Sequence, residues 1–200
     1  MSIVLYGPRG GSSLRPHWAL HELGLSYETK EIELSKGEHK TPEYLAINPA
    51  GQVPAMNVDG FLLAESLAMT HYLAQKYNPT LLGSTPEEQA KGLQWSLWIL
   101  LKIQEKGFSK LLMPKWTGVA DDAGVAAGKE QLVKELPLLE SQLGTRFYLA
   151  GDQFTIADIN GVSTFAYARW AEYDLSSYPN ISAWIARCEE RPAYKAAKGE

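Results

Sequence analysis

The stretch Asn48–Ser66, NPAGQVPAMNVDGFLLAES, decides the fold of this chain. It opens with the turn-forming residues Asn48-Pro49-Ala50-Gly51 and then enters the mostly apolar run 55–58. Asp59-Gly60 is a dipeptide typical of a two-residue β-hairpin turn, so the run 61–64 is expected to pair back on the first run. A helix begins directly afterwards. The stretch therefore predicts two antiparallel strands followed by a helix.

Pro54 stands at the first position of the hairpin, where its missing N–H is tolerated. We expect a cis bond between Val53 and Pro54, which turns the N–H and C=O of Val53 outward to pair with an extended peptide. The first turn of the following helix, with its unpaired N–H groups and the Ser66 hydroxyl, suits a carboxylate, and Glu65 suits the accompanying ammonium group. Each feature alone also fits a structural proline or an ordinary helix N-cap, but together they favour a binding site.

These residues resemble the glutathione site of the cytosolic glutathione S-transferase family. NPAGQVP followed by AES resembles the family's glutathione-binding segment, and PEYLAINP just upstream resembles the approach to it. The resemblance extends to FTIADIN near residue 155, and its motifs are nearest to the bacterial beta-like and serine-type classes. It implies glutathione as co-substrate, bound by Gln52, Val53, Pro54, Glu65 and Ser66, with His39 near its glycine carboxylate.

The elements that precede residue 78 are expected in a thioredoxin-like order. A buried strand at 3–6, a helix from about 13 to 23 and a strand at 27–34 form a βαβ unit, and one or two helical turns at 42–47 lead into the hairpin. Dithiol redox proteins carry Cys-x-x-Cys at the start of the first helix, where this chain has Ser12-Ser13-Leu14-Arg15. Dithiol redox activity is therefore excluded.

The composition changes from strand-and-turn to helical patterns at a short linker rich in Pro, Gly, Ser and Thr. Thr85-Pro86-Glu87-Glu88 then predicts a capping box, and a second box is predicted where Thr155 caps a helix and Asp158 reaches back. We expect an α/β thioredoxin-like glutathione-binding domain at 1–78, a linker at 79–86 and an all-α domain at 87–200. This is the glutathione transferase architecture that the resemblance implies.

Composition limits the classes of partner. A formal net charge of −4 does not favour nucleic acid or an anionic membrane surface. Met1 leads directly into a strand-like run and no apolar run is long enough to cross a bilayer, so we expect a cytoplasmic protein that acts on small molecules. The single cysteine, Cys188, rules out an internal disulfide. His17 and His21 lie one helical turn apart but lack a third ligand, so we expect no metal.

The reaction that the resemblance implies is addition of the glutathione thiolate to an electrophile. Lowering the pKa of a thiol by ~2 units from ~8.5 takes roughly 2.7 kcal/mol of preferential stabilisation of the anion, which a hydrogen-bond donor at a helix start can supply. The candidate donors are Ser12, Ser13 and Tyr6, in that order. Counted without gaps, Ser12 matches the cysteine of the beta class, whereas the plant-type serine falls on Gly10. Helix capping by the serines and core packing by Tyr6 are the alternative roles.

Three functional classes are compatible with these motifs. The first is a transferase that conjugates glutathione to small electrophiles. The second is a glutathione-dependent isomerase, dehalogenase or peroxidase on the same site, and the third is a non-catalytic binding protein on the same scaffold. The resemblance also implies a homodimer. Arg15 and Arg169 are candidate anion partners, although solvated surface positions are the more ordinary expectation for arginine.

Overall fold

The computed structural model of the protein describes residues 2–200. The chain forms two compact units, one made of the residues up to Pro79 together with Arg191–Glu200, and the other of Thr80–Glu190. The expected helical domain at 87–200 thus differs from the structure at its end, because the last helix packs within the N-terminal unit. The expected linker at 79–86 contains a 3₁₀ turn at Pro79–Leu82.

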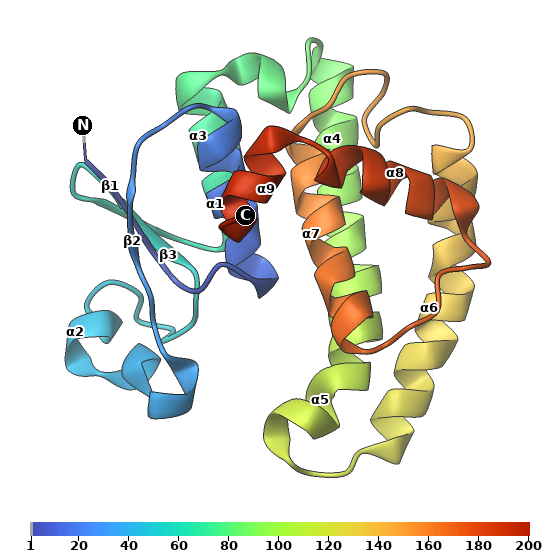
Figure 1. Cartoon of the computed structure of the whole chain (residues 1–200), viewed down its shortest axis with the longest axis horizontal. Coiled ribbons are helices and arrows are strands. Elements are labelled where there is room, and N and C mark those ends of the chain that lie inside the picture. Colours follow the sequence, from blue (N-terminus) through green and yellow to red (C-terminus); the bar gives the residue numbers. More distant parts are fainter. Residues whose placement is uncertain (1) are drawn as a thin grey trace. The chain divides into compact units, whose positions relative to one another are not determined.

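The N-terminal unit is built on a four-stranded mixed sheet with the order β2-β1-β3-β4 (Figure 1). Strand β1 is parallel to β2 and antiparallel to β3, and β3 is antiparallel to β4. Helices α1 and α3 lie side by side in this unit. The bounds are β1 Ile3–Tyr6, α1 Leu14–Glu22, β2 Glu28–Lys30, α2 Pro42–Leu45, β3 Ala55–Val58, β4 Phe61–Ala64, α3 Ser66–Tyr77 and α9 Pro192–Lys198, with 3₁₀ turns at Gly11–Ser13, Leu34–Lys36 and Glu38–Lys40.

The hairpin prediction is confirmed. Val58 pairs with Phe61 across a two-residue turn in which Asp59 and Gly60 both have positive φ, 52° and 92°. Asn57 accepts a hydrogen bond from the Gly60 N–H through Oδ1 at 2.8 Å, which closes the turn. Local sequence therefore specifies this part of the sheet.

The second strand is shorter than predicted, because β2 ends at Lys30 rather than near residue 34. Within residues 2–200 it is an edge strand, with β1 as its only neighbour in the sheet order. Beyond it, the N–H of Glu33 donates to Oε2 of Glu38 at 2.7 Å instead of to a strand, and Leu34–Lys36 forms a 3₁₀ turn. A local side-chain acceptor has replaced the sheet as the hydrogen-bond partner here.

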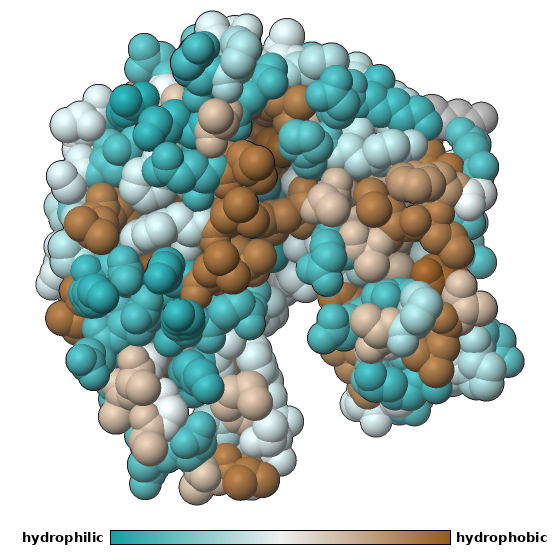
Figure 2. All heavy atoms as spheres, turned by 180° about the vertical axis from the view of Figure 1, so that it is seen from behind, coloured by the Kyte–Doolittle hydropathy of each residue, from teal (hydrophilic) through white to brown (hydrophobic). Residues whose placement is uncertain are grey.

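The second unit is helical throughout its regular elements (Figure 1). None of the helices in residues 2–200 is long and apolar enough to cross a membrane. Helix α4 continues through a π-helical segment into α5. Leu93 and Leu97 of α4 are 51% and 43% exposed, and Leu101 of the π-helical segment is 51% exposed. Figure 2 shows hydrophobic residues on the face of the protein opposite to that of Figure 1. The bounds are α4 Pro86–Trp98, the π-helical segment Ile99–Phe108, α5 Ser109–Thr117, α6 Asp122–Leu143, α7 Ile156–Trp170 and α8 Pro179–Glu189.

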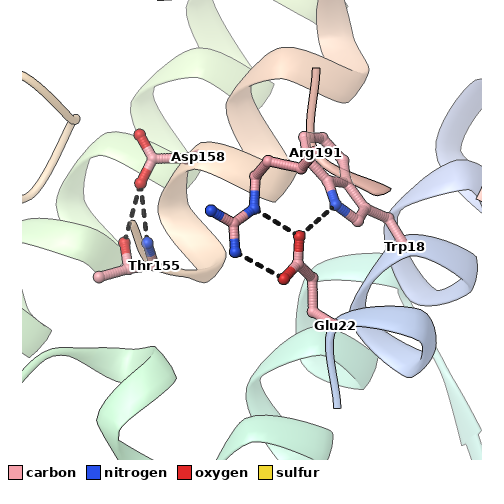
Figure 3. A network of polar contacts seen from close by, with 5 residues as sticks. All are labelled: Trp18, Glu22, Thr155, Asp158 and Arg191. Atoms are coloured by element: carbon pink, nitrogen blue, oxygen red, sulfur yellow. Dashed lines mark hydrogen bonds and ion pairs between the residues drawn. The ribbon is translucent and has the colours of Figure 1, made fainter. Parts of the chain in front are cut away.

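The start of α7 carries the second predicted capping box, which is confirmed (Figure 3). Asp158 is fully buried, and its carboxylate accepts hydrogen bonds from the N–H and Oγ1 of Thr155, from the N–H of Leu149 and from Nε1 of Trp184. Four donors from three places in the unit thus converge on one carboxylate. It joins the helix start to the preceding loop and to α8.

The first predicted box is formed with a different partner. Thr85 caps α4 by accepting from the Glu88 N–H at 3.2 Å, as expected. The Glu88 carboxylate, however, accepts from the N–H of Ser84 at 2.7 Å rather than from that of Thr85. The reciprocal bond therefore extends one residue further back along the chain, and the helix start is still tied down from both sides.

An ion pair holds α9 within the N-terminal unit (Figure 3). The guanidinium of Arg191 donates to both carboxylate oxygens of Glu22 at 2.6 and 2.7 Å, and Trp18 donates from Nε1 to the same carboxylate at 2.9 Å. The Glu22 side chain is 8% exposed, so this bidentate pair is better shielded from water than a surface pair. At the other end of the helix, Arg9 donates to the carbonyls of Ala196 and Ala197.

Two histidines of α1 meet one tyrosine. The Nδ1 atom of His17 lies 2.9 Å from the Tyr27 hydroxyl, which lies 3.1 Å from Nε2 of His21. Burial, followed by the positive charge of Arg9, lowers the pKa of His17 to about 4, so the imidazole is neutral at pH 7. In residues 2–200 no group of three or more His, Cys, Asp or Glu side chains is placed to hold a metal ion.

Replacing Asp158 by alanine is expected to lower the free energy of unfolding by about 3–5 kcal/mol, because buried donors that now share the carboxylate would lose their acceptor. Urea unfolding followed by circular dichroism measures the change. Asp152→Ala removes an exposed carboxylate from the same loop region and serves as the control. A loss below about 1 kcal/mol in Asp158→Ala would show that the network contributes little.

Stability is expected to fall as the pH drops from about 6.5 to about 4, because the unfolded state protonates His17 at the higher value and the folded state only at the lower one. The stabilisation is fully present above about pH 6.5, and its loss amounts to at most about 3 kcal/mol. Urea unfolding at pH 7.5 and pH 4.5 measures it. His17→Gln should flatten this dependence while the exposed-site control His71→Gln retains it; equal slopes would refute the assignment.

Candidate functional site

The turn before Val53 is held through the carbonyl of Gln52. The Tyr44 hydroxyl and Nδ2 of Asn48 both donate to this carbonyl at 2.7 Å. Burial raises the pKa of Tyr44 to about 12, so its phenol remains a donor at neutral pH. Lys40 donates from Nζ to the carbonyl of the neighbouring Gly51 at 2.9 Å. Two consecutive carbonyls of the turn are thus fixed by side chains from α2 and its surroundings.

Gly51 is required where the turn meets the segment that carries His39. Its φ is +58°, and a Cβ built there would lie 2.8 Å from the carbonyl oxygen of His39 and 2.9 Å from Nζ of Lys40. The structure thus brings His39 to the turn, as the predicted site requires. The His39 side chain is half-buried, and its buried Nδ1 has no hydrogen-bond partner within residues 2–200.

The bond between Val53 and Pro54 is cis, which confirms that prediction. Val53 is half-buried, and its carbonyl accepts a hydrogen bond from Oγ of Ser12 at 3.3 Å. Pro54 is buried and leads into β3, whereas the side chain of Gln52 is exposed. The structure therefore joins Ser12, the first candidate thiol donor, to Val53, the residue whose backbone is predicted to pair with a peptide.

The three candidate donors have different surroundings. Ser13 is 1% exposed, and a Cβ on Gly7 would lie 2.6 Å from its Oγ, so this hydroxyl faces the backbone of Gly7 inside the unit. It makes no capping hydrogen bond, so the alternative of a simple helix cap does not hold for Ser13. Tyr6 is half-buried, with its ring 6.3 Å from the ring of Tyr44. Ser12 is half-buried and reaches the Val53 carbonyl.

The other half of the predicted site lies at the start of α3. Glu65 is exposed and has φ +68° and ψ 110°, a conformation that costs a residue other than glycine about 1–3 kcal/mol. Ser66, the first residue of the helix, is 6% exposed, and its Oγ accepts a hydrogen bond from Nη1 of Arg15 at 3.1 Å. The helix start thus combines unpaired N–H groups, a held hydroxyl and a nearby guanidinium.

The expectation that Arg15 lies at the solvated surface is wrong, since this side chain is only 1% exposed. Residues 14–20 of α1 are all buried, so this part of the helix has no solvent-exposed face. The usual rule that an arginine on a helix lies on its exposed face therefore fails here. We did not predict from the sequence that Tyr44 and Asn48 hold the turn through the Gln52 carbonyl. An asparagine before Pro-x-Gly is a recognisable Asx-turn signal, and the N–H of Ala50 does donate to Oδ1 of Asn48 at 3.1 Å.

Two family models match the sequence. Residues 1–75 match the glutathione S-transferase N-terminal domain, and residues 102–192 match the glutathione S-transferase C-terminal domain. The first range contains every residue predicted to bind or activate glutathione. The second lies almost wholly within the helical unit. The two family models therefore divide the chain in nearly the same way as its two units, the one built on the sheet and the helical one.

Known proteins match along nearly the whole chain. Glutathione S-transferase F10 of Arabidopsis thaliana is 32% identical over 98% of this chain and 95% of its own, and glutathione S-transferase 1 of Zea mays is 35% identical over 88% and 85%. Among solved structures, a glutathione S-transferase-I bound to lactoylglutathione has a TM-score of 0.86 at 32% identity, covering 100% of this chain and 99% of its own. Poplar glutathione transferase F1 has a TM-score of 0.89 at 29% identity, covering 98% and 96%. The chain belongs to the glutathione S-transferase family.

Proposed function

We propose that this protein binds glutathione in its N-terminal unit, activates the thiol with Ser12 and transfers the thiolate to small electrophiles. The observation that carries the proposal is the hydrogen bond from Ser12 to the carbonyl of Val53. This bond joins a hydroxyl near a helix start to the backbone of Val53, which is the position expected to pair with an extended peptide. Family membership supports glutathione as the peptide.

The binding mode follows from the chemistry of each group. The cysteinyl N–H and C=O of glutathione pair with the C=O and N–H of Val53, as a strand pairs with a sheet edge. The γ-glutamyl carboxylate lies on the first turn of α3 with Ser66, and its ammonium group lies on the Glu65 carboxylate. Gln52 assists from the turn, and His39 takes the glycine carboxylate.

In the structure the Ser12 hydroxyl donates to a backbone carbonyl rather than to a thiol. This contact suggests how glutathione binding turns the hydroxyl towards the sulfur. Its proton is now donated to the Val53 carbonyl at 3.3 Å. When the cysteinyl N–H of glutathione takes that carbonyl, the Ser12 hydroxyl becomes available to donate to the sulfur. A donor stabilises the thiolate but not the thiol, so the thiol proton passes to water at a lower pH. The thiolate then forms a bond to carbon, and the electrophile's leaving group departs where it has one.

This binding mode implies an enzyme of the serine type. That the chain is nearest to the bacterial beta-like and serine-type classes stays a prediction. We infer a homodimer from family membership and from the exposed leucines of α4 and the π-helical segment, since apolar surface at helical spacing is typical of an interface. We also infer a cytoplasmic location. Small electrophiles are the proposed second substrates, without nucleic acid or membrane as partners.

Ser12→Ala is expected to raise the pKa of bound glutathione by about 1–2 units, because the anion loses a donor worth roughly 1.5–3 kcal/mol. Ultraviolet absorbance of the thiolate, titrated in the presence of excess enzyme, measures this pKa directly. Turnover of an aryl halide at neutral pH should fall while the affinity for glutathione stays nearly unchanged.

Ser13→Ala and Tyr6→Phe are the matched controls for Ser12, since each removes one neighbouring hydroxyl. Both should leave the pKa of bound glutathione near the wild-type value. If Tyr6→Phe raises this pKa and Ser12→Ala does not, a tyrosine-type mechanism replaces the serine-type one.

Glu65→Gln is expected to weaken glutathione binding by about tenfold, because the ammonium of the γ-glutamyl group loses its charged partner. Calorimetric titration with glutaryl-cysteinylglycine, which lacks that ammonium, is the internal control. Its affinity should not fall in the variant. An equal loss for both ligands would show that Glu65 acts through the backbone of the helix start rather than through its charge.

A further inference from the structure

We propose that Arg15 is a positioning residue that turns the Ser66 hydroxyl towards the γ-glutamyl carboxylate, so that the protein selects thiols carrying this carboxylate. The inference rests on the proposed function, because it concerns the same glutathione site. It assigns a role to a buried arginine that otherwise has none in the reaction.

The contact itself is direct and well shielded. Nη1 of Arg15 lies 3.1 Å from Oγ of Ser66, with Arg15 1% exposed and Ser66 6% exposed. Arg15 belongs to the first turn of α1 and Ser66 begins α3, and these two helices pack against each other. The geometry therefore links the start of one helix to the start of the other.

Donor chemistry fixes the direction of this hydrogen bond. A guanidinium has only donors, so the Ser66 oxygen must be the acceptor, through one of its lone pairs. The hydroxyl keeps its own proton for a different acceptor. An arginine behind the oxygen thus directs the O–H away from itself, and a carboxylate is a strong acceptor for a proton presented in that way.

Charge adds to the effect of direction. The first turn of α3 already presents unpaired N–H groups and the positive end of the helix dipole. A guanidinium one hydrogen bond behind Ser66 places a permanent positive charge on the same side, where burial limits its screening by salt. The ligand group favoured by this arrangement is a carboxylate, whereas a neutral substituent gains neither the charge nor the directed proton.

The test compares two ligands that differ by this single group: glutathione and 4-aminobutyryl-cysteinylglycine, which lacks the γ-glutamyl carboxylate. Calorimetric titration gives the ratio of their dissociation constants for each protein. The wild type should prefer glutathione by about tenfold or more. In Arg15→Met the preference should shrink to within about threefold, with the affinity for the carboxylate-free ligand almost unchanged.

Further variants separate positioning from general damage. Arg15→Lys keeps a donor with positive charge and should restore part of the preference. Ser66→Ala should reduce the preference, and adding Arg15→Met to it should change little more, because the two residues act as a unit. Arg146→Met removes an exposed arginine of the helical unit and should leave the preference intact.

Each outcome has one meaning. If the wild type binds neither ligand, the proposed glutathione function fails first. If it prefers glutathione and a folded Arg15→Met retains the full preference, the role of Arg15 is overturned while the function stands. Should Arg15→Met not fold, the additivity of Arg15→Lys with Ser66→Ala decides: additive losses overturn the proposal, and non-additive losses support it.

Discussion

The candidate site depends on the hydrogen bonds that hold the carbonyl of Gln52. Tyr44 and Asn48 both donate to it at 2.7 Å, so the turn has two side-chain supports at the residue just before Val53. A turn held at that point fixes the backbone of Val53, which in the proposed binding mode pairs with glutathione as a strand edge does. Gly51 completes the arrangement, because a side chain there would collide with the segment of His39.

In both units, important polar contacts lie at the first turns of helices. In the N-terminal unit the first turns of α1 and α3 meet through Arg15 and Ser66, which brings the Arg15 guanidinium to the positive end of the α3 dipole. In the helical unit the acceptor at the start of α7 is the protein's own Asp158, which also bonds to Leu149 and Trp184. A helix start thus belongs to the proposed binding site in one unit and supports the fold in the other, depending on whether a ligand or a side chain supplies the acceptor.

Much of the fold could be predicted from local patterns. The Asp59-Gly60 hairpin, the cis bond at Pro54 and the cap at Thr155 all depend on residues close together in the chain, and the structure confirms each of them. The second strand and the reciprocal bond of the Thr85 cap were predicted less well. At both places an acidic side chain accepts from an N–H outside the regular pattern, that of Glu33 or that of Ser84.

The sequence by itself determined the order of elements, the turn at Asn48–Gly51, the hairpin and the helix starts, because each is decided by dihedral preferences and hydrogen bonds within a few residues. Only the tertiary structure decided that Arg15 is buried against Ser66, that Ser12 reaches Val53 and that the last helix packs within the N-terminal unit through Glu22 and Arg191. These contacts join residues 41 to 169 positions apart. No local preference encodes them, since they arise when separate elements compete to bury apolar surface and pair their charges.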